Sequence, residues 1–162
     1  MARALLVGCG CRGRELGSKL VDRGWAVRGT TRWDAGTAAI ESAGIEPAIA
    51  DPDRPGTVLD QVGDVAILVW LMGSAGGAAE VVAAINGPRL ESLLEKLVDT
   101  PVRGVVYEAE GSVPDGVLAH GAKLVEAASE RWRIPARILR ADPTAHDGWG
   151  AEACEAVTSL LG

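Results

Sequence analysis

The chain has 162 residues and a formal net charge of −6, because 22 acidic residues outnumber 16 lysines and arginines. This length favours a single domain over residues 1–162, and a hydrophobic content of 48% argues against a disordered protein. The negative charge argues against a surface for nucleic acid or an anionic membrane. No apolar run reaches the ~18 residues of a spanning helix, and the start of the chain leaves no room for a signal peptide. We therefore expect a cytoplasmic protein.

The three cysteines indicate neither a disulfide nor a metal site. Cys9 and Cys11 form a C-x-C pair, and Cys154 lies far along the chain. A zinc site needs a second pair of ligands or a nearby histidine, and neither accompanies this pair. We expect reduced, structural thiols and no bound metal.

Strand-like and helix-like segments alternate along the chain. The short runs rich in apolar and β-branched residues are Ala4–Val7, Ala26–Gly29, Pro47–Ala50, Val65–Trp70, Gly104–Tyr107 and Ala136–Leu139. The helix-like stretches are Arg14–Arg23, Gly36–Ala43, Ala78–Ile85, Leu90–Leu97, Val117–Trp132 and Glu152–Leu161. Several strand runs are apolar throughout, as strands covered on both faces are. The alternation predicts an α/β fold with one doubly wound, six-stranded parallel sheet between two layers of helices, and no separate substrate domain.

A glycine-rich loop follows the first strand. Its glycines have the spacing Gly8-x-Gly10-x-x-Gly13, and the residues after them open the first helix. This is the dinucleotide-binding fingerprint in the strand–turn–helix context that it requires. Gly8 permits the tight turn, Gly10 lets a pyrophosphate approach the backbone, and Gly13 lets the helix pack closely on the strand. We predict that the loop and the helix N-terminus bind a nucleotide, with a glycine-rich turn that has no ligand as the alternative.

The end of the second strand indicates which dinucleotide is bound. NAD-binding proteins place Asp or Glu about 20 residues after the loop, where the carboxylate accepts from the ribose 2′-hydroxyl. Here Thr31 and Arg32 stand in this segment and suit a 2′-phosphate, which Arg12 in the glycine loop can also approach. Asp34 can serve an NAD ribose if the register shifts. We predict NADP, with NAD as the alternative.

Several sequence pieces, in their order, resemble one known family over nearly the whole chain. The pieces are "LLVGCGCRGRELGSKLVDRGWAVRGTTR", "PAIADP", "VAILVW", "GVVYEAEGSV" and "HGAKLVEAASERWRIPARILRADPTAHDGWG". They are similar to successive strands and helices of the extended and atypical short-chain dehydrogenase/reductase (SDR) superfamily. The resemblance implies a single-domain Rossmann fold with strand order 3-2-1-4-5-6 and a bound NAD(P).

The resemblance also assigns residues of the cofactor site. It places Asp51, at the end of the third strand, beside the adenine. Trp70 and Met72 end the fourth strand and either wall the adenosine pocket or pack in the core. The predicted cofactor-binding residues are Gly8, Gly10, Cys11, Arg12, Gly13, Thr31, Arg32, Asp51, Trp70 and Met72.

The catalytic residues of the family are only partly present. The family reduces carbonyls with a Tyr that donates a proton, a Lys four residues later that lowers the pKa of that Tyr, and a Ser that polarises the substrate. Lys123 matches the Lys, but Ala119 stands at the Tyr position, and the only tyrosine is Tyr107 at the end of the fifth strand. The Ser position falls near Ala109 and Glu110. Two of the three catalytic side chains are therefore missing.

The candidate catalytic residues are Lys123, His120 and Tyr107. His120 is either a substitute acid, because imidazole titrates near neutral pH, or an ordinary surface residue of its helix. Glu108 and Glu110 flank the expected substrate mouth, where they are either a proton source or solvated carboxylates at a strand end.

These features predict an NADP(H)-binding atypical SDR-like protein that is noncatalytic or senses redox state. One alternative is a small NADPH-dependent reductase of flavin-like acceptors, which needs only to position the cofactor and the small-molecule acceptor. A second alternative is a scaffold protein with a vestigial nucleotide site. If the protein is an enzyme, we expect an NAD(P)-dependent oxidoreductase.

The resemblance further implies a homodimer, because two helices of the family commonly pair across a two-fold axis. The matching stretches are Leu90–Leu97 and Val117–Trp132. On the second stretch, Ala122, Val125 and Ser129 carry little charge, and we expect them to receive another helix.

Overall fold

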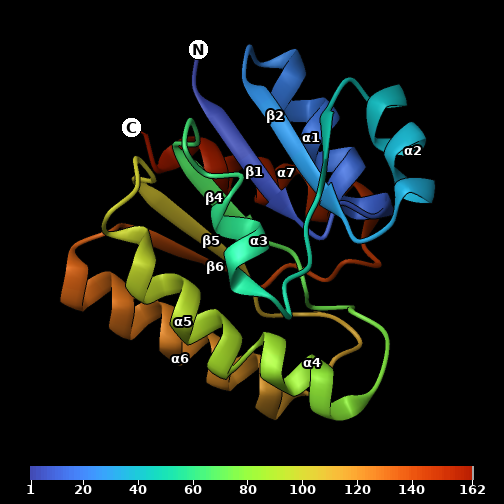
Figure 1. The fold of residues 1–162 in the computed structure, drawn as a ribbon. Coiled ribbons are helices and arrows are strands. Elements are labelled where there is room, and N and C mark those ends of the chain that lie inside the picture. The colour runs from blue at the N-terminus through green and yellow to red at the C-terminus, as the bar shows by residue number, and fades with distance from the viewer. Residues whose placement is uncertain (162) are drawn as a thin grey trace.

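A computed structural model shows a six-stranded sheet with helices on both faces (Figure 1). It describes residues 1–161, apart from the side chains of residues 146 and 147. The strands are β1 (Arg3–Val7), β2 (Ala26–Thr31), β3 (Glu46–Ile49), β4 (Ile67–Trp70), β5 (Gly104–Glu108) and β6 (Ala136–Leu139). The helices are α1 (Cys11–Asp22), the 3-10 turn η1 (Asp34–Gly36), α2 (Thr37–Ser42), α3 (Pro55–Leu59), α4 (Ala79–Ile85), α5 (Pro88–Leu97), α6 (Asp115–Trp132) and α7 (His146–Ser159).

The strand order of the sheet is β3-β2-β1-β4-β5-β6, and each neighbouring pair is parallel. This confirms the predicted doubly wound sheet with strand order 3-2-1-4-5-6. The order reverses between β1 and β4, where Leu6 lies beside Val69 and Val7 beside Trp70. In open α/β sheets, such a switch point opens a crevice at the carboxyl ends of the strands, where ligands bind.

Alternating strand side chains build two hydrophobic cores, one on each face of the sheet. Leu5 and Val7 belong to the core beneath α3, α4, α5 and α6, whereas Ala4 and Leu6 belong to the core beneath α1, α2 and α7. Figure 1 shows α5 and α6 side by side on one face of the sheet, with α1 and α7 on the other. Because β4 is covered on both faces, all four of its residues are buried, which explains its continuous apolar sequence.

The side of α6 that was expected to contact a second subunit is buried within the chain. Ala122 and Val125 are only 3% and 1% exposed, and they pack inside the chain together with Leu118. Val125 and Ser129 line the same small internal gap as Leu94 of α5. The prediction that Ala122, Val125 and Ser129 receive a helix of another subunit is therefore wrong, because α5 of the same chain covers that side.

The sequence did not indicate α3, which has only five residues. An element of this length shows no apolar periodicity, although Pro55 at its first position is a common helix start. Within the described residues, no helix is both long enough and apolar enough to cross a membrane.

Candidate functional site

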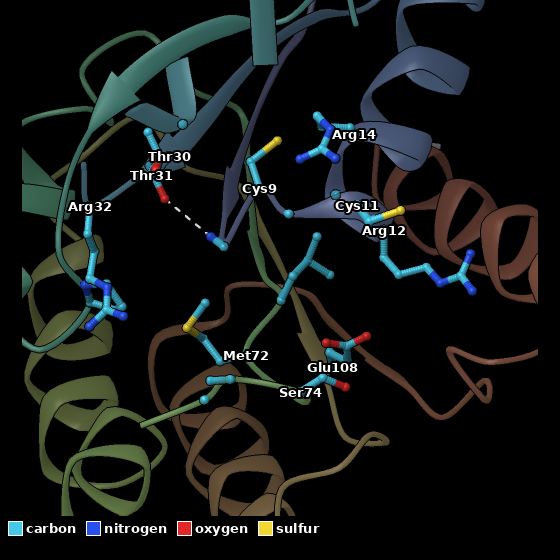
Figure 2. Close-up of a pocket in the computed structure, with 18 of the residues that line it drawn as sticks. Cys9, Cys11, Arg12, Arg14, Thr30, Thr31, Arg32, Met72, Ser74 and Glu108 are labelled. Carbon is cyan, nitrogen blue, oxygen red and sulfur yellow. Dashed lines mark hydrogen bonds between the residues drawn. The ribbon is translucent and has the colours of Figure 1, made fainter. Parts of the chain in front are cut away.

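A cleft of about 580 Å³ lies at the carboxyl ends of the strands. Its walls come from the loop after β1 with the start of α1, from the tip of β2, and from the loops after β4 and β5. The lining side chains that can form polar, ionic or aromatic contacts are Trp33 and nine residues labelled in Figure 2, which are Cys9, Cys11, Arg12, Arg14, Thr30, Thr31, Arg32, Ser74 and Glu108.

The glycine loop has the geometry that a bound pyrophosphate requires. Gly8 has φ +95°, and a Cβ built there lies 2.2 Å from Met72 Cε and 2.6 Å from the Leu71 carbonyl oxygen. A Cβ on Gly13 lies 3.0 Å from the Gly8 carbonyl oxygen, so helix and loop pack closely there and a side chain would require a small shift of the backbone. A Cβ on Gly10 meets no atom within 4 Å. Gly8 and Gly13 therefore serve the fold, whereas Gly10 keeps space in front of the backbone open for a ligand.

The N-terminus of α1 is suited to an anion. Its N-cap is Gly10, which has no side chain to cap the helix, and the first turn contains no acidic residue. The amide of Arg14 donates to the Gly10 carbonyl, while the amides before it are the ones that an α-helix leaves without an intrahelical acceptor. These donors and the helix dipole favour phosphate at this end of the cleft.

The tip of β2 adds a cation on one side of this loop. Arg32 and Trp33 both line the cleft, and the Arg32 guanidinium lies 5.7 Å from the centre of the Trp33 ring. Among the described residues, Arg32 forms no ion pair with a carboxylate. Thr31 also lines the cleft, and its hydroxyl donates to the Trp33 carbonyl. The predicted Thr31–Arg32 pair is therefore placed together, and its guanidinium is available to an anionic ligand.

Two arginines of α1 point in different directions. Arg12 lies 3.4 Å from Glu15, and in Figure 2 its side chain extends away from Arg32. Arg14 also lines the cleft and lies on the side of the loop nearer Arg32 in that view. Sequence reasoning missed Arg14, although its position directly after Gly13 places it in the first turns of the helix.

The remaining predicted cofactor residues divide into two groups. Cys11 and Met72 line the cleft. Asp51 does not line it, although its neighbours do, and its carboxylate accepts from the Asp53 amide at 2.9 Å. Trp70 is fully buried in the core and does not line the cleft either. At the ends of β3 and β4, the residues next to Asp51 and Trp70 line the cleft in place of these two predicted residues.

None of the three candidate catalytic side chains lines the cleft. His120 and Lys123 are exposed on α6. Tyr107 is buried against α4 and α6, where burial raises the pKa of its hydroxyl well above the ordinary value and the charge of Glu108 adds to the effect. The structure therefore does not bring these residues together into a site.

The carboxylate of Glu108 does line the cleft, at the end of β5. It is only 4% exposed, so the expectation of a solvated carboxylate is wrong for this residue, whereas Glu110 is exposed. Its oxygens accept from the Gly73 amide at 3.0 Å and from the Trp149 indole N–H at 3.2 Å. Burial raises the pKa of Glu108, and both N–H donors oppose that rise by stabilising the anion.

The fold is shared with solved structures of two epimerases and a reductase. UDP-glucuronic acid 4-epimerase from Bacillus cereus, solved in complex with NAD, superimposes with a TM-score of 0.68 at 16% identity, over 85% of this chain and 55% of that chain. Triphenylmethane reductase from Citrobacter sp., complexed with NADP(H), has a TM-score of 0.63 at 18% identity, over 85% of this chain and 48% of that chain. UDP-N-acetylglucosamine 4-epimerase from Bacillus cereus has a TM-score of 0.64 at 14% identity, over 86% and 53%.

These likenesses show that the chain has a Rossmann fold like that of the two epimerases and the reductase, so the predicted resemblance is confirmed for the fold. The chain spans about half the length of the solved structures that it matches. No protein-family model matches the sequence, and no curated protein matches it.

Proposed function

We propose that this protein binds NADP(H) in the cleft as a noncatalytic SDR-like protein that senses redox state. The observation that carries the proposal is that three features share one cleft. They are the open space in front of Gly10, the α1 N-terminus without an acidic residue in its first turn, and the Arg32 guanidinium. A pyrophosphate then binds at the loop, and the 2′-phosphate binds at Arg32 and Thr31, with Arg14 as a further cation. When bound, the cofactor would supply hydride chemistry; this chain supplies the site that holds it.

The absence of the three candidate catalytic side chains from the described lining of the cleft supports the noncatalytic function. A carbonyl reductase needs a positioned acid within hydrogen-bond reach of its substrate. Tyr107, His120 and Lys123 do not line the cleft. On this proposal, a partner or a regulated process responds to whether the cofactor is bound, and no turnover of a substrate is needed.

The test is calorimetric titration of the full chain with NADPH, NADH and their oxidised forms. Arg32→Ala should weaken NADPH binding by tens-fold, which corresponds to about 2 kcal/mol for a charge-assisted phosphate contact, and should leave NADH binding nearly unchanged. Arg131→Ala is the matched control, because Arg131 also lies over a neighbouring tryptophan, at 5.0 Å, but is outside the cleft. Equal losses for NADPH and NADH would exclude the assigned phosphate contact. No binding of any dinucleotide would favour the scaffold alternative.

A further inference from the structure

The charged side chains that line the cleft are distributed unevenly. Arg12, Arg14 and Arg32 lie on the glycine loop, α1 and the tip of β2. Among the described lining residues, Glu108 is the only one with a carboxylate, and it lies at the end of β5. Figure 2 shows Arg32 and Glu108 on opposite sides of the cleft. Arg32 and Glu108 therefore place a positive charge at the β2 side and a negative charge at the β5 side of the described lining.

The sheet order determines how a dinucleotide can span these two sides. The strand order reverses between β1 and β4, and a dinucleotide lies across such a reversal with one nucleotide on each side. If its 2′-phosphate binds at Arg32, its other nucleotide lies over the ends of β4 and β5, where Ser74 and Glu108 line the cleft. That nucleotide carries the nicotinamide. Its ring is a cation in the oxidised cofactor and neutral in the reduced one.

We propose that Glu108 makes the cleft prefer the oxidised over the reduced dinucleotide, by placing a buried negative charge at the nicotinamide half. This inference rests on the proposed function, because it requires a nicotinamide dinucleotide in the cleft. It adds the physical means by which a noncatalytic protein distinguishes the two redox states: a differential affinity set by one charge.

The hydrogen bonds of Glu108 stabilise its ionised form and oppose the burial that raises its pKa. Two N–H donors, from Gly73 and Trp149, point at its two carboxylate oxygens. A glutamine at this position would place its NH2 group, which accepts no hydrogen bond, against one of these two N–H donors.

The position of Glu108 is also rigidly held. A Cβ on Gly73 lies 2.9 Å from Glu108 Oε1 and 2.4 Å from the Glu110 carbonyl oxygen, so the loops after β4 and β5 are in close contact. The Val113 amide donates to the Gly73 carbonyl at 2.9 Å and ties these loops together. These contacts hold the Glu108 carboxylate in the cleft wall, whether the nicotinamide ring beside it is oxidised or reduced.

The experiment compares the dissociation constants of NADP⁺, NADPH and adenosine 2′,5′-bisphosphate for the wild type, Glu108→Gln and Glu110→Gln. The wild type should bind NADP⁺ about tenfold more tightly than NADPH, since a charge pair in a partly buried site contributes on this order. Glu108→Gln should abolish this ratio while binding the bisphosphate, which has no nicotinamide, as the wild type does. Glu110→Gln removes an exposed carboxylate on the same loop and should keep the wild-type ratio.

The outcomes separate the two proposals. A wild type that binds NADPH at least as tightly as NADP⁺ overturns the inference about Glu108 without any variant, even if Glu108→Gln does not fold. A ratio unchanged in a folded Glu108→Gln that still binds the bisphosphate overturns it as well. A wild type that binds none of the three ligands overturns the proposed function, and the inference with it.

Discussion

The hydroxyl of Tyr107 donates a hydrogen bond of 2.8 Å to the side-chain oxygen of Asn86, and both residues are buried. The Asn86 amide in turn donates to the Val82 carbonyl at 3.1 Å, one turn earlier in α4. A Cβ on Gly121 of α6 would lie only 2.0 Å from the Tyr107 hydroxyl oxygen, so α6 packs directly on this pair. The only tyrosine of the chain therefore links β5 to α4 and α6 and faces away from the cleft.

This hydrogen bond predicts the effect of Tyr107→Phe. The change leaves the buried Asn86 oxygen without its donor, so the free energy of unfolding should fall by about 1–3 kcal/mol. Dinucleotide affinity should not change, because the ring stays in place and does not line the cleft. Urea unfolding and calorimetric titration measure the two quantities. If Tyr107→Phe lost dinucleotide affinity but kept the wild-type free energy of unfolding, Tyr107 would have a role in the site.

Substitution of two neighbouring glycines should separate folding from binding. Gly8→Ala forces a side chain onto φ +95° and against Met72 and the Leu71 carbonyl, so it should destabilise the fold by on the order of 2 kcal/mol. Gly10→Ala meets no protein atom, so the fold should lose less than about 0.5 kcal/mol. Its methyl group occupies the space expected for the pyrophosphate, and NADPH affinity should fall at least about tenfold. Full NADPH affinity in Gly10→Ala would mean that no pyrophosphate binds there.

A cluster of ion pairs at Asp64 should make stability depend on pH. Arg28 donates to Asp64 at 2.7 Å, and Arg3 also pairs with it. The Arg28 hydrogen bond is the largest cause that lowers the pKa of Asp64 from 3.8 to about 2. The folded state therefore binds fewer protons than the unfolded state, and the stabilisation from the ionised carboxylate is lost as pH falls from 3.8 to about 2.

Urea unfolding at several acidic pH values measures this effect. The free energy of unfolding of the wild type should fall over that window, and Asp64→Asn should show a smaller fall. Asp99→Asn, at an exposed position, is the control and should follow the wild type. Parallel curves for all three proteins would contradict the assigned ion pairs.

The wild type should not reduce simple aldehydes or ketones at a useful rate. General acid catalysis contributes about 10²–10⁴-fold, and no tyrosine, histidine or lysine side chain lines the described part of the cleft. The loss of NADPH absorbance in the presence of small carbonyl compounds is the assay. Robust turnover would establish an enzyme and make Glu108, the one carboxyl group of the lining, the first residue to test as its acid.

A homodimer remains our prediction for the assembly, with the contact placed outside the Ala122–Val125 side of α6. Light scattering at micromolar concentration should return twice the chain mass of 16.7 kDa. A mass of one chain would contradict it. If a dimer forms, charge reversal at exposed positions of α6, such as Lys123 and Glu126, would test whether that helix forms the contact.

Most of the fold could be predicted from the sequence because its signals are local. Each of the six strands is a short segment with several apolar or β-branched residues, and the observed strands agree with the predicted ones to within two residues at each end. The glycine spacing located the first turn, since Gly8 has a positive φ with little space for a side chain and Gly13 packs closely on the Gly8 carbonyl. The side of α6 that contacts α5 was less predictable, because alanines and small polar residues give a helix no distinct apolar face.

The site was less predictable because it depends on contacts between distant segments. Glu108 follows an apolar strand, and the sequence cannot show that Gly73 and Trp149 remove it from water. Trp70 and Tyr107 stand at strand ends, and whether such a side chain faces the cleft or a core depends on the alternation of the strand. The directions of Arg12 and Arg14 likewise depend on their positions around α1, because two residues correspond to about 200° of rotation about the helix axis.

The tryptophans differ sharply in their surroundings. Trp33 is 68% exposed at the edge of the cleft, whereas Trp70 and Trp149 are fully buried. An exposed indole emits at longer wavelength than a buried one, so Trp33 should contribute most to the red edge of the fluorescence spectrum, with smaller contributions from the half-buried Trp25 and Trp132. A ligand that enters beside Arg32 would change that emission and leave the buried signal as an internal reference. The protein thus carries an optical probe of its own cleft, and Trp33→Phe would silence it.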